Sequence, residues 1–581
     1  MLQKHANEEI RGHIDYLVNL IEKAQQPDGY LNIHFVVNEP DKRWSNLRDL
    51  HELYNGGHLI EASLAHHQFT ASRQFLDIAL RFVHYCASVF GPEQDGKMPG
   101  YPGHPEIELA LLRLYRRTQD RTALELATFF ITERGKNGAE YYVKEQAKRG
   151  EHPQLAPGAM PHYGAYWYMQ AHMPIKDQQT IEGHAVRAGY LLTGVADLVL
   201  AEESGLCAEH RKAPNSAVFR LWDDMVMRKM YITGGIGSVD QWEGFSSLPY
   251  SLPNSNDEGG CYAETCAGIS VIMVAERLLA LKLDSHLAEV AERALYNASV
   301  TSGISVDGRS FMYVNQLASS PQQACSRFDW FDCACCPPNV LRTLGVLGGF
   351  FWSVSGDHTA LAIHQYFDGA IELPNGAAKL VIKTQYPWHG RIEVFVDPGT
   401  SMKVLLRVPG WAVNSAWYAF EPARHRLVNG YIVLSPGNNV LTLEMQPRLA
   451  RCHPDTMQDT VTLLRGPLVY CLEDADNPWA KNHFKELCIS ADTDMASVKE
   501  VWEDGVLKLP LPKAGYHLRT PRGEAATHLY AGANEVANTP HSKAYEEAEG
   551  QGRDLVFIPF FYRANRKKQD VQVRTSFRRK A

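Results

Sequence analysis

The sequence predicts a multidomain protein of the α plus β class, with a helical N-terminal part followed by strand-rich parts. Three observations support this prediction. The chain has 581 residues, more than one hydrophobic core usually supports. Apolar residues recur with a helical period through about the first 355 residues. From about residue 356 they alternate with a period of two, and turn signals separate the runs, as is typical of strands.

Apolar residues at helical spacing predict the first helix, namely Ile10, Ile14, Leu17, Val18 and Ile21. Further helices are expected over 76–89, 106–116, 184–201, 217–230, 267–281, 286–296 and 340–352. Five of the predicted helices begin at a polar, reactive residue, in the segments Gly57-His58, Gly103-His104, Gly183-His184, Glu264-Thr265-Cys266 and Cys335-Cys336. If helices alternate between an inner and an outer ring, these five starts face one mouth of the ring.

The strand-rich parts follow. Period-two runs at 379–383, 391–396, 403–408 and 440–445 are separated by turns such as Asp397-Pro398-Gly399, a spacing typical of a β-sandwich. A third region begins near 461–467 and ends with 555–561. We therefore expect domains at 1–355, 356–455 and 456–581, with a flexible polar insert near 534–552.

Composition and charge limit the classes of partner. The net charge is -8 and no long run of Lys or Arg occurs, which argues against nucleic acid or an anionic membrane. The first residues have no apolar signal core, and no stretch is apolar enough to span a bilayer, so we expect a cytoplasmic location. The 24 histidines suit a pocket that hydrogen-bonds a polar ligand. The sequence does not specify the oligomeric state, and a homodimer remains open.

Cysteines gather in one part of the chain, where six of the eleven lie between Cys261 and Cys336. In a chain without a sign of secretion, this favours a metal or a reactive thiolate over a disulfide framework. Glu264 and Cys266 would point about 200° apart on a helix, so their joint use requires an extended backbone or a helix just beginning. Thiolates and a carboxylate suit Zn²⁺. Inert buried cysteines, a vicinal disulfide and a purely structural zinc site remain alternatives.

Other candidates are less specific by themselves. Glu243, between aromatic neighbours, is a candidate general acid, although it also fits a surface loop. Asp257-Glu258 compete for that role. His58, His104 and His184 recur at similar places, which favours pocket lining over three separate structural roles. Tyr313 fits a buried strand or a residue that orients a thiolate.

Six motifs resemble glycoside hydrolase family 127, the family of β-L-arabinofuranosidases. In chain order they are Gly56-Gly57-His58-Leu59-Ile60-Glu61-Ala62, Gly103-His104 with Glu106-Ile107-Glu108-Leu109-Ala110, Gly183-His184-Ala185-Val186-Arg187-Ala188, Tyr231-Ile232-Thr233-Gly234-Gly235-Ile236-Gly237, Tyr262-Ala263-Glu264-Thr265-Cys266-Ala267 and Cys333-Ala334-Cys335-Cys336-Pro337-Pro338-Asn339. They run across the whole helical part, whereas the strand-rich part matches by architecture.

The resemblance implies an (α/α)₆-barrel catalytic domain, N-terminally shortened in this chain, followed by antiparallel β-sandwich domains. It implies Zn²⁺ held by Glu264, Cys266, Cys335 and Cys336, with Cys335 also the nucleophile and Glu243 the acid/base. It assigns substrate binding to His58, His104, His184 and Tyr313. The expected function is a retaining exo-acting β-L-arabinofuranosidase with a carbohydrate as its partner. A hydrolase for another sugar, a non-catalytic carbohydrate-binding protein and a sugar epimerase are the rival hypotheses.

Overall fold

The structure, a computed structural model, describes residues 7–151, 166–201, 217–412, 417–418, 427–490, 493–517 and 552–580. These residues form two compact units. The first contains the chain up to Lys229 together with Gln241–Ser247 and Met273–Lys282, and the second contains Met230–Asp240, Leu248–Ile272 and everything from Leu283 onward. Apart from Gly552, the insert expected near 534–552 lies outside the described residues.

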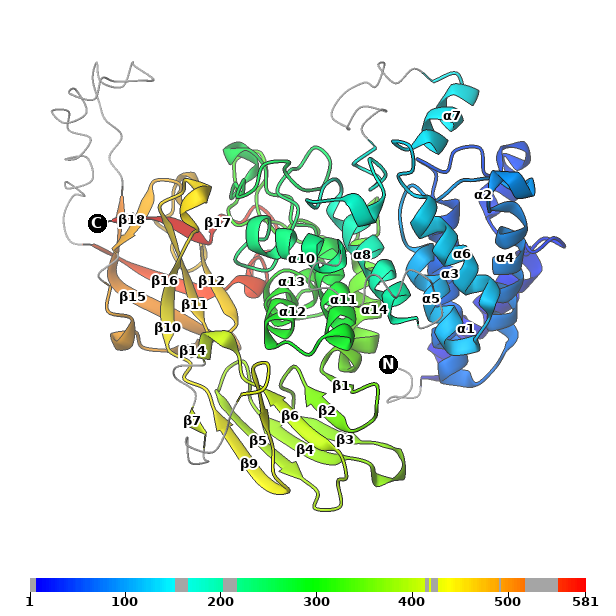
Figure 1. Cartoon of the computed structure of the whole chain (residues 1–581). Coiled ribbons are helices and arrows are strands. Elements are labelled where there is room, and N and C mark those ends of the chain that lie inside the picture. The colour runs from blue at the N-terminus through cyan, green and yellow to red at the C-terminus, as the bar shows by residue number, and fades with distance from the viewer. Residues whose placement is uncertain are drawn as a thin grey trace, which may run out of the picture. The chain divides into compact units, whose positions relative to one another are not determined.

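The first unit is helical, which confirms the helical period of the sequence (Figure 1). Its helices are α1 (Glu8–Ala24), α2 (Ile33–Val37), α3 (Glu52–Thr70), α4 (Gln74–Val89), α5 (Ile107–Thr118), α6 (Arg121–Glu133), α7 (Glu140–Lys148), α8 (Ala185–Leu200) and α10 (Ala217–Arg228). Helix α8 is buried along almost its whole length and on all its faces, as expected of a central helix. Helix α5 packs against α3, α6 and α8.

One predicted helix start is wrong. His58 does not begin a helix but lies inside α3, which starts at Glu52. The Gly56-Gly57 pair breaks the apolar pattern without breaking the helix, because both glycines allow close packing. A Cβ atom on Gly56 would lie 2.4 Å from the Phe82 ring, and one on Gly57 would lie 2.7 Å from the Glu106 side chain. These glycines bring α4 and the start of α5 close to α3.

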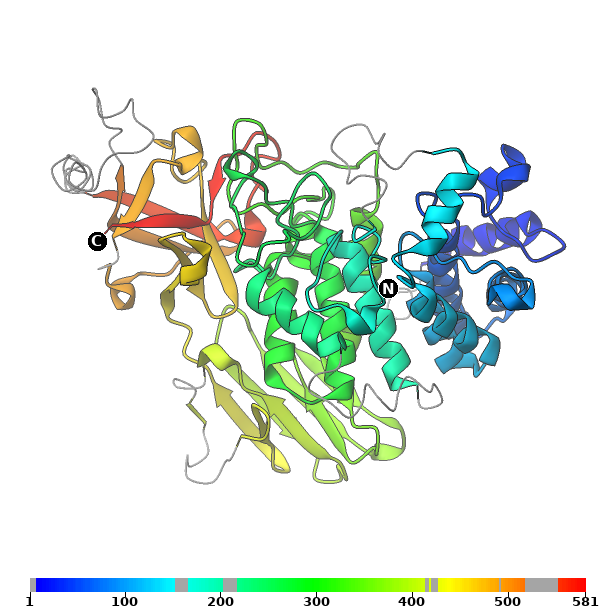
Figure 2. The ribbon, with the colours of Figure 1, turned by 45° about the horizontal axis from the view of Figure 1, so that its top comes forward.

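The second unit begins with helices and continues as sheets (Figure 2). Its helical segments are the start of α11 (Thr265–Leu281), then α12 (Ser285–Asn297), α13 (Val300–Gly303) and α14 (Cys336–Val346). The helix expected over 340–352 is shorter than predicted. It ends at Val346, and β1 (Trp352–Val354) begins soon after. The glycines at 345, 348 and 349 explain the early end, because glycine disfavours the helix interior.

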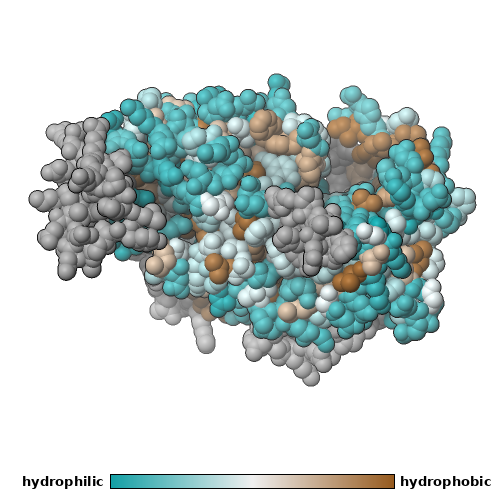
Figure 3. Space-filling model, turned by 90° about the horizontal axis from the view of Figure 1, so that it is seen from above, coloured by the Kyte–Doolittle hydropathy of each residue, from teal (hydrophilic) through white to brown (hydrophobic). Residues whose placement is uncertain are grey.

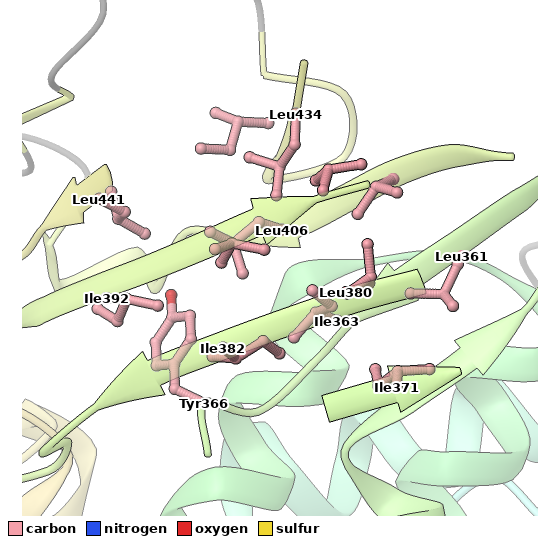
Figure 4. Packing of buried hydrophobic residues seen from close by; sticks show 14 of the residues in the cluster. Leu361, Ile363, Tyr366, Ile371, Leu380, Ile382, Ile392, Leu406, Leu434 and Leu441 are labelled. Atoms are coloured by element: carbon pink, nitrogen blue, oxygen red, sulfur yellow. The ribbon is translucent and has the colours of Figure 1, made fainter. Parts of the chain in front are cut away.

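Two sheets share one hydrophobic core (Figure 4). The four-stranded sheet has the order β1, β2 (Ala360–Ile363), β6 (Lys403–Arg407) and β8 (Tyr431–Val433). The five-stranded sheet has the order β3 (Gly369–Glu372), β4 (Lys379–Thr384), β5 (Arg391–Val396), β9 (Gly437–Thr442) and β7 (Trp417–Tyr418). Alternate residues of β4 are buried, and Leu380 and Ile382 contribute to the same core as Leu361 and Leu406 of the other sheet. The period of two in the sequence therefore corresponds to a strand with one face in the core and the other toward solvent.

A nine-stranded sheet completes the second unit. Along its main path the order is β10 (Pro447–Arg451), β11 (Thr460–Arg465), β18 (Ser576–Lys580), β13 (Leu487–Ser490), β15 (Val506–His517), β16 (Arg553–Pro559), β12 (Leu468–Glu473) and β17 (Val573–Arg574), and β14 (Val501–Glu503) pairs with β15. Strand β12 is buried throughout, so both of its faces are covered.

The expectation of antiparallel pairing throughout is wrong for two strand pairs. Strands β2 and β6 pair in parallel, and so do β13 and β18. Between β2 and β6 the chain passes through β3, β4 and β5 of the other sheet. A parallel pair needs such a long crossover connection, which a hairpin cannot provide.

The face of the molecule in Figure 3 is mostly hydrophilic, with apolar residues in small separate groups. Within the described ranges, no helix combines the length and the apolar character that crossing a bilayer would need.

Candidate active site

Four side chains predicted as metal ligands meet in the second unit. The ligand atoms of Glu264, Cys266, Cys335 and Cys336 all lie within 4.8 Å of one another. The Cys266 and Cys336 sulfurs are 3.4 Å apart, and those of Cys335 and Cys336 are 3.8 Å apart. Oε1 of Glu264 lies 3.3 Å from the Cys335 sulfur and 3.4 Å from the Cys336 sulfur. These are the four residues that the resemblance implies as ligands, and the structure brings them together.

The backbone at Glu264 is extended, as the two-residue spacing to Cys266 predicts. Glu264 forms an isolated antiparallel bridge with Val314, and α11 begins at the next residue. Cys266 therefore lies in the first turn of α11. The preceding Ala263 has a φ of 45°, a strained value for a residue with a side chain. Its N–H donates to the Gly237 carbonyl at 2.8 Å, so the glycine-rich segment ending at Gly237 supports the turn that delivers Glu264.

Cys335 and Cys336 occupy the start of α14. Cys335 is its N-cap and Cys336 its first residue, followed by Pro337 and Pro338. Proline is accepted there because the first N–H groups of a helix have no partner within the helix. The helix N-terminus also favours negative charge, which stabilises thiolates. A turn at a helix start thus allows two adjacent sulfurs to reach one centre.

Residues far along the chain hold this loop in place. The Asn315 side chain donates from Nδ2 to the Ala263 carbonyl at 3.1 Å and to Oγ1 of Thr265 at 2.9 Å. Its Oδ1 accepts from Nη2 of Arg563 at 2.7 Å. Arg563 is 1% exposed and follows β16 of the nine-stranded sheet. This sheet therefore helps to orient Glu264, which lies almost 300 positions earlier than Arg563.

Tyr313 contacts the cluster directly. Its hydroxyl lies 2.9 Å from the Cys335 sulfur. The surrounding thiols of Cys266 and Cys336, together with the Tyr313 hydroxyl, stabilise a thiolate and lower the pKa of Cys335 to about 2. Burial raises the pKa of Cys266, Cys336 and Tyr313. Tyr313 therefore stays protonated and donates to a thiolate at position 335.

The donor set fits a tetrahedral ion of the size of Zn²⁺. With Zn–S about 2.3 Å and Zn–O about 2.1 Å, tetrahedral geometry places two sulfurs about 3.8 Å apart and a sulfur about 3.6 Å from an oxygen. The four separations given above, 3.3–3.8 Å, lie within about 0.4 Å of these values. Three thiols and a carboxylate are donor types that Zn²⁺ accepts. The residues thus fit the cofactor that the sequence predicts.

In the first unit, His184 and Glu243 form a hydrogen-bonded pair. His184 caps the start of α8, where its Nδ1 accepts from the Val186 N–H at 3.1 Å. Nε2 must then carry the proton, and it donates to Oε2 of Glu243 at 3.0 Å. The main chains of Gly183 and Gly244 run so close together that a Cβ on Gly244 would lie 2.0 Å from the Gly183 carbonyl. These glycines bring the Glu243 loop to the start of α8.

The three predicted histidines lie together in the first unit. Tyr54 contacts His58 and His104, each with ring centroids 4.5 Å away, and the His104 ring lies 5.7 Å from that of His184. Nδ1 of His58 lies 3.0 Å from the fully buried carboxylate of Glu106. Positions 58, 104 and 184 thus form one imidazole-rich group, although His58 comes from the middle of a helix.

Burial favours the uncharged form of His104 and of its neighbour His51. It lowers the pKa of His104 well below its ordinary value, and the nearby Arg187 guanidinium lowers it further. The same two causes lower the pKa of His51, whose ring lies 5.8 Å from that of His104, to about 4. Nδ1–H of His104 donates to the Pro105 carbonyl at 2.8 Å. Neutral imidazoles with one fixed proton suit hydrogen bonds to hydroxyl groups.

Asp257 and Glu258, the competing candidates for the general acid, make ion pairs within the second unit. Glu258 accepts from Arg574 at 2.8 Å and from Asn254 at 3.2 Å. Asp257 accepts from Lys485 at 3.0 Å. Burial alone would raise the pKa of Asp257, but hydrogen bonds from Ser255 and Lys485 lower it overall. Both acidic side chains thus have partners that account for their presence without a catalytic role.

Comparison with known proteins identifies the family. The model of the β-L-arabinofuranosidase GH127 catalytic domain matches residues 1–349, and that of the glycoside hydrolase family 127 C-terminal domain matches residues 447–575. The chain belongs to glycoside hydrolase family 127. It is therefore an enzyme of the glycoside hydrolase class.

Relatives of this GH127 chain include characterised enzymes. A non-reducing end β-L-arabinofuranosidase of Bifidobacterium longum subsp. longum is 33% identical over 98% of this chain and 86% of its own length. The crystal structure of a GH127 β-L-arabinofuranosidase from Geobacillus stearothermophilus T6 is 32% identical with a TM-score of 0.82, covering 99% of this chain and 88% of the other. A solved GH127 β-arabinofuranosidase is 28% identical with a TM-score of 0.78, covering 99% and 86%.

Sequence reasoning missed several residues of the GH127 site. Asn315 and Arg563 support the Glu264 loop, and Tyr54 and His51 belong to the histidine group. Tyr54 lies one helical turn and His51 about two turns before His58, a spacing that could have signalled a shared face. Arg563 gave no such signal, because its partner Asn315 is 248 positions away.

Proposed function

We propose that this protein is a retaining, exo-acting β-L-arabinofuranosidase in which Cys335 is the nucleophile and Glu243 the general acid/base. The main support for this proposal is the environment of the Cys335 sulfur. The surrounding cluster stabilises its thiolate, and the sulfur accepts a hydrogen bond from Tyr313. The activity of the 33% identical relative supports the choice of sugar. Most glycosidases use two carboxylates, but a thiolate can take the place of the nucleophilic one.

We propose Zn²⁺ as the ion held by Glu264, Cys266, Cys335 and Cys336, because their donor types and separations fit it. When bound, the ion would balance the thiolate charge and keep these sulfurs deprotonated at neutral pH. Cys266 and Cys336 are almost fully buried, whereas Cys335 is partly exposed. This difference supports assigning the nucleophile to Cys335 and a purely structural ligand role to the other two.

The reaction takes two displacements. The Cys335 thiolate attacks the anomeric carbon, the C–S bond forms as the C–O bond breaks, and the leaving oxygen takes the proton of Glu243. Glu243 then removes a proton from water, whose oxygen attacks the same carbon and breaks the C–S bond. Two inversions give net retention. The His184 Nε2–H bond orients the Glu243 carboxylate, and Tyr313 orients the thiolate.

Sugar recognition is assigned to the remaining polar groups. We propose that His58, His104, His184 and Tyr313 surround the arabinofuranosyl ring. His58 and His104 would hydrogen-bond its hydroxyls through ring nitrogens. Both nitrogens of His184 are already engaged, by the Val186 N–H and by Glu243, so His184 would contact the sugar while it orients Glu243. We also propose that the helical part closes as an (α/α)₆ barrel and that the sheets form β-sandwiches. The TM-score of 0.82 to a GH127 enzyme supports this architecture.

The test is Cys335→Ser. We expect hydrolysis of an aryl β-L-arabinofuranoside to fall by about 10³-fold or more, because the hydroxyl is a far weaker nucleophile than the thiolate. Cys333→Ser is the matched control, since Cys333 is exposed and lies two residues away. Unchanged turnover in Cys335→Ser would refute the thiolate mechanism. A panel of other aryl glycosides, including acidic ones, tests the choice of sugar.

A further inference from the structure

We propose that Glu106 is a positioning residue of the histidine group. Its carboxylate holds the proton of His58 on Nδ1, so that Nε2 of His58 is the nitrogen that accepts a hydrogen bond from a hydroxyl of the terminal sugar. This inference rests on the proposed function, which places His58 at the sugar. It adds a residue that acts through His58 without touching the sugar itself.

Glu106 and His58 form a close pair inside the first unit. Nδ1 of His58 lies 3.0 Å from Oε1 of Glu106. The Glu106 side chain is 0% exposed, whereas that of His58 is 35% exposed. One edge of the imidazole is therefore engaged in the interior of the unit, while another part of the ring remains accessible to a ligand.

The position of Glu106 favours the ionised carboxylate. Glu106 is the N-cap residue of α5, and the start of a helix favours negative charge. A buried carboxylate also needs a hydrogen-bond donor close by, because burying its charge without one is costly. Nδ1–H of His58 is such a donor. When Nδ1 carries the proton, Nε2 of the neutral ring is an acceptor.

A second buried pair fixes the backbone of Glu106. The Glu106 N–H donates to Oε2 of Glu108 at 3.1 Å, and Oε1 of Glu108 accepts from Nη2 of Arg134 at 2.8 Å. The same Nη2 donates to the Pro102 carbonyl at 2.7 Å. The side chains of Arg134 and Glu108 are 2% and 1% exposed. Because water is excluded from this pair, it holds the start of α5, and with it Glu106, in one position.

Helix α3 leaves room for the contact. A Cβ atom on Gly57 would lie 2.7 Å from Cγ of Glu106 and 2.8 Å from the Ile107 nitrogen, so a larger residue would push Glu106 away from His58. The His58 ring also packs edge-on against Tyr54, with centroids 4.5 Å apart and planes at 84°. A hydrogen bond and an aromatic contact thus fix the orientation of the imidazole together.

The neighbouring histidines show what the carboxylate adds. Nδ1–H of His104 donates to the Pro105 carbonyl, so its Nε2 is also an acceptor, whereas Nε2 of His184 donates to Glu243. A carboxylate accepts more strongly than a carbonyl, and it makes the opposite ring nitrogen more basic. His58 is therefore the strongest hydrogen-bond acceptor of the three and suits a hydroxyl that donates.

A metal ion is the alternative ligand for these side chains, because His58, Glu61 and Glu106 offer ligand atoms within 4.8 Å of one another. Glu61, however, forms an ion pair with the guanidinium of Arg113, which balances its charge. A cation bound by Glu61 would have to compete with that guanidinium. The contacts thus favour the hydrogen bond between Glu106 and His58 over a metal site.

The experiment is a double-mutant cycle with methyl β-L-arabinofuranoside as the substrate. Glu106→Leu removes the acceptor and should lower kcat/KM by about 10- to 100-fold. The loss should lie mainly in KM, because a hydrogen bond to a hydroxyl that does not react stabilises the bound substrate and the transition state alike. Glu106→Gln, which keeps an acceptor oxygen, should recover most of this loss. When His58→Leu is already present, Glu106→Leu should lower kcat/KM by less than about twofold more.

Glu145→Leu is the matched control, because Glu145 is another buried carboxylate of the first unit, 5% exposed, and it should leave kcat/KM unchanged. Additive losses in the cycle, or an equal loss in Glu145→Leu, would overturn the proposal, because both indicate general damage to the helical unit. Elemental analysis should find the same metal content in Glu106→Leu as in the wild type. A lower metal content would overturn the proposal in favour of a metal site at His58.

NMR of the wild-type enzyme with ¹⁵N-labelled histidine reads the tautomer directly, since the ring nitrogen without a proton resonates far downfield of the protonated one. The His58 signals are those that disappear in His58→Leu. We expect the proton on Nδ1, and a proton on Nε2 alone would overturn the proposal even if Glu106→Leu did not fold. If the wild-type enzyme did not cleave the glycoside, the proposed function would fail, which is a different result from the wrong tautomer.

Discussion

The sulfur cluster of the second unit and the histidine group of the first unit each bring polar side chains together, but of different kinds. In the cluster, three sulfurs and a carboxylate crowd within 4.8 Å of one another. In the histidine group, imidazoles meet at ring distances of 4.5–5.8 Å through Tyr54 and through each other. The cluster gathers thiols and a carboxylate, which are negatively charged when deprotonated, and the histidine group includes His104 and His51, whose pKa burial lowers.

This difference separates the two roles. Three thiols whose sulfurs lie 3.4–3.8 Å apart cannot all ionise without a cation, because the negative charges would repel one another. In agreement with this, the pKa of Cys335 is lowered while those of Cys266 and Cys336 are raised. Imidazoles whose pKa is lowered by burial need no counter-ion. This difference supports the proposed division of roles, with a metal and the nucleophile in the cluster and the sugar hydroxyls at the histidine group.

The largest expected effect breaks the cluster itself. Cys336→Ser should remove the bound metal and lower hydrolysis by about 10⁴-fold. The reason is that Cys336 is fully buried and its sulfur lies within 3.8 Å of a ligand atom of each of the three other proposed ligands. Elemental analysis and turnover of an aryl arabinofuranoside are the measurements. Cys471→Ser, at an equally buried position on β12, is the control. One equivalent of metal retained in Cys336→Ser would contradict the ligand assignment.

The second effect tests whether Glu243, which is hydrogen-bonded to His184, is the general acid/base. Glu243→Gln should lower kcat for a methyl glycoside by about 10²- to 10⁴-fold, with a smaller loss for an aryl glycoside whose leaving group needs little protonation. Glu258→Gln should keep most activity, since Arg574 and Asn254 already engage that carboxylate. A larger loss in Glu258→Gln than in Glu243→Gln would reverse the assignment.

The smallest effect concerns stability and the neutral state of His104. Its pKa is lowered from 6.5 in the folded protein, so below pH 6.5 the unfolded chain binds a proton that the folded chain does not. The contribution to stability is complete above pH 6.5 and decreases as the pH falls, by up to about 1.4 kcal/mol per pH unit. His104→Gln should therefore flatten the loss of stability between pH 7 and pH 5.

Urea unfolding at the two pH values measures this difference. His13→Gln is the control, because the side chain of His13 is 72% exposed. A His104→Gln variant whose stability falls as steeply as that of the wild type would show that His104 is charged in the folded protein.

Much of the fold and of the cluster could be predicted from local patterns. The two-residue spacing of Glu264 and Cys266 implied an extended residue before a helix, and α11 begins at Thr265. The adjacent sulfurs with two following prolines implied a helix start, and α14 begins at Cys336. The error at His58 arose because glycines used for close helix packing resemble a helix break in sequence.

By itself the sequence determined the order of helices and strands, because periodicity records neighbours along the chain. The family resemblance, and not the spacing, joined Glu264 and Cys266 to Cys335 and Cys336 as predicted ligands, because 70 positions separate Cys266 from Cys336. Only the tertiary structure decided that His184 bonds Glu243, 59 positions away, and that Arg563 supports Asn315, 248 positions away. Such pairs depend on close packing, as where Gly183 meets Gly244, and a local pattern carries no information about which distant segment will fill that space.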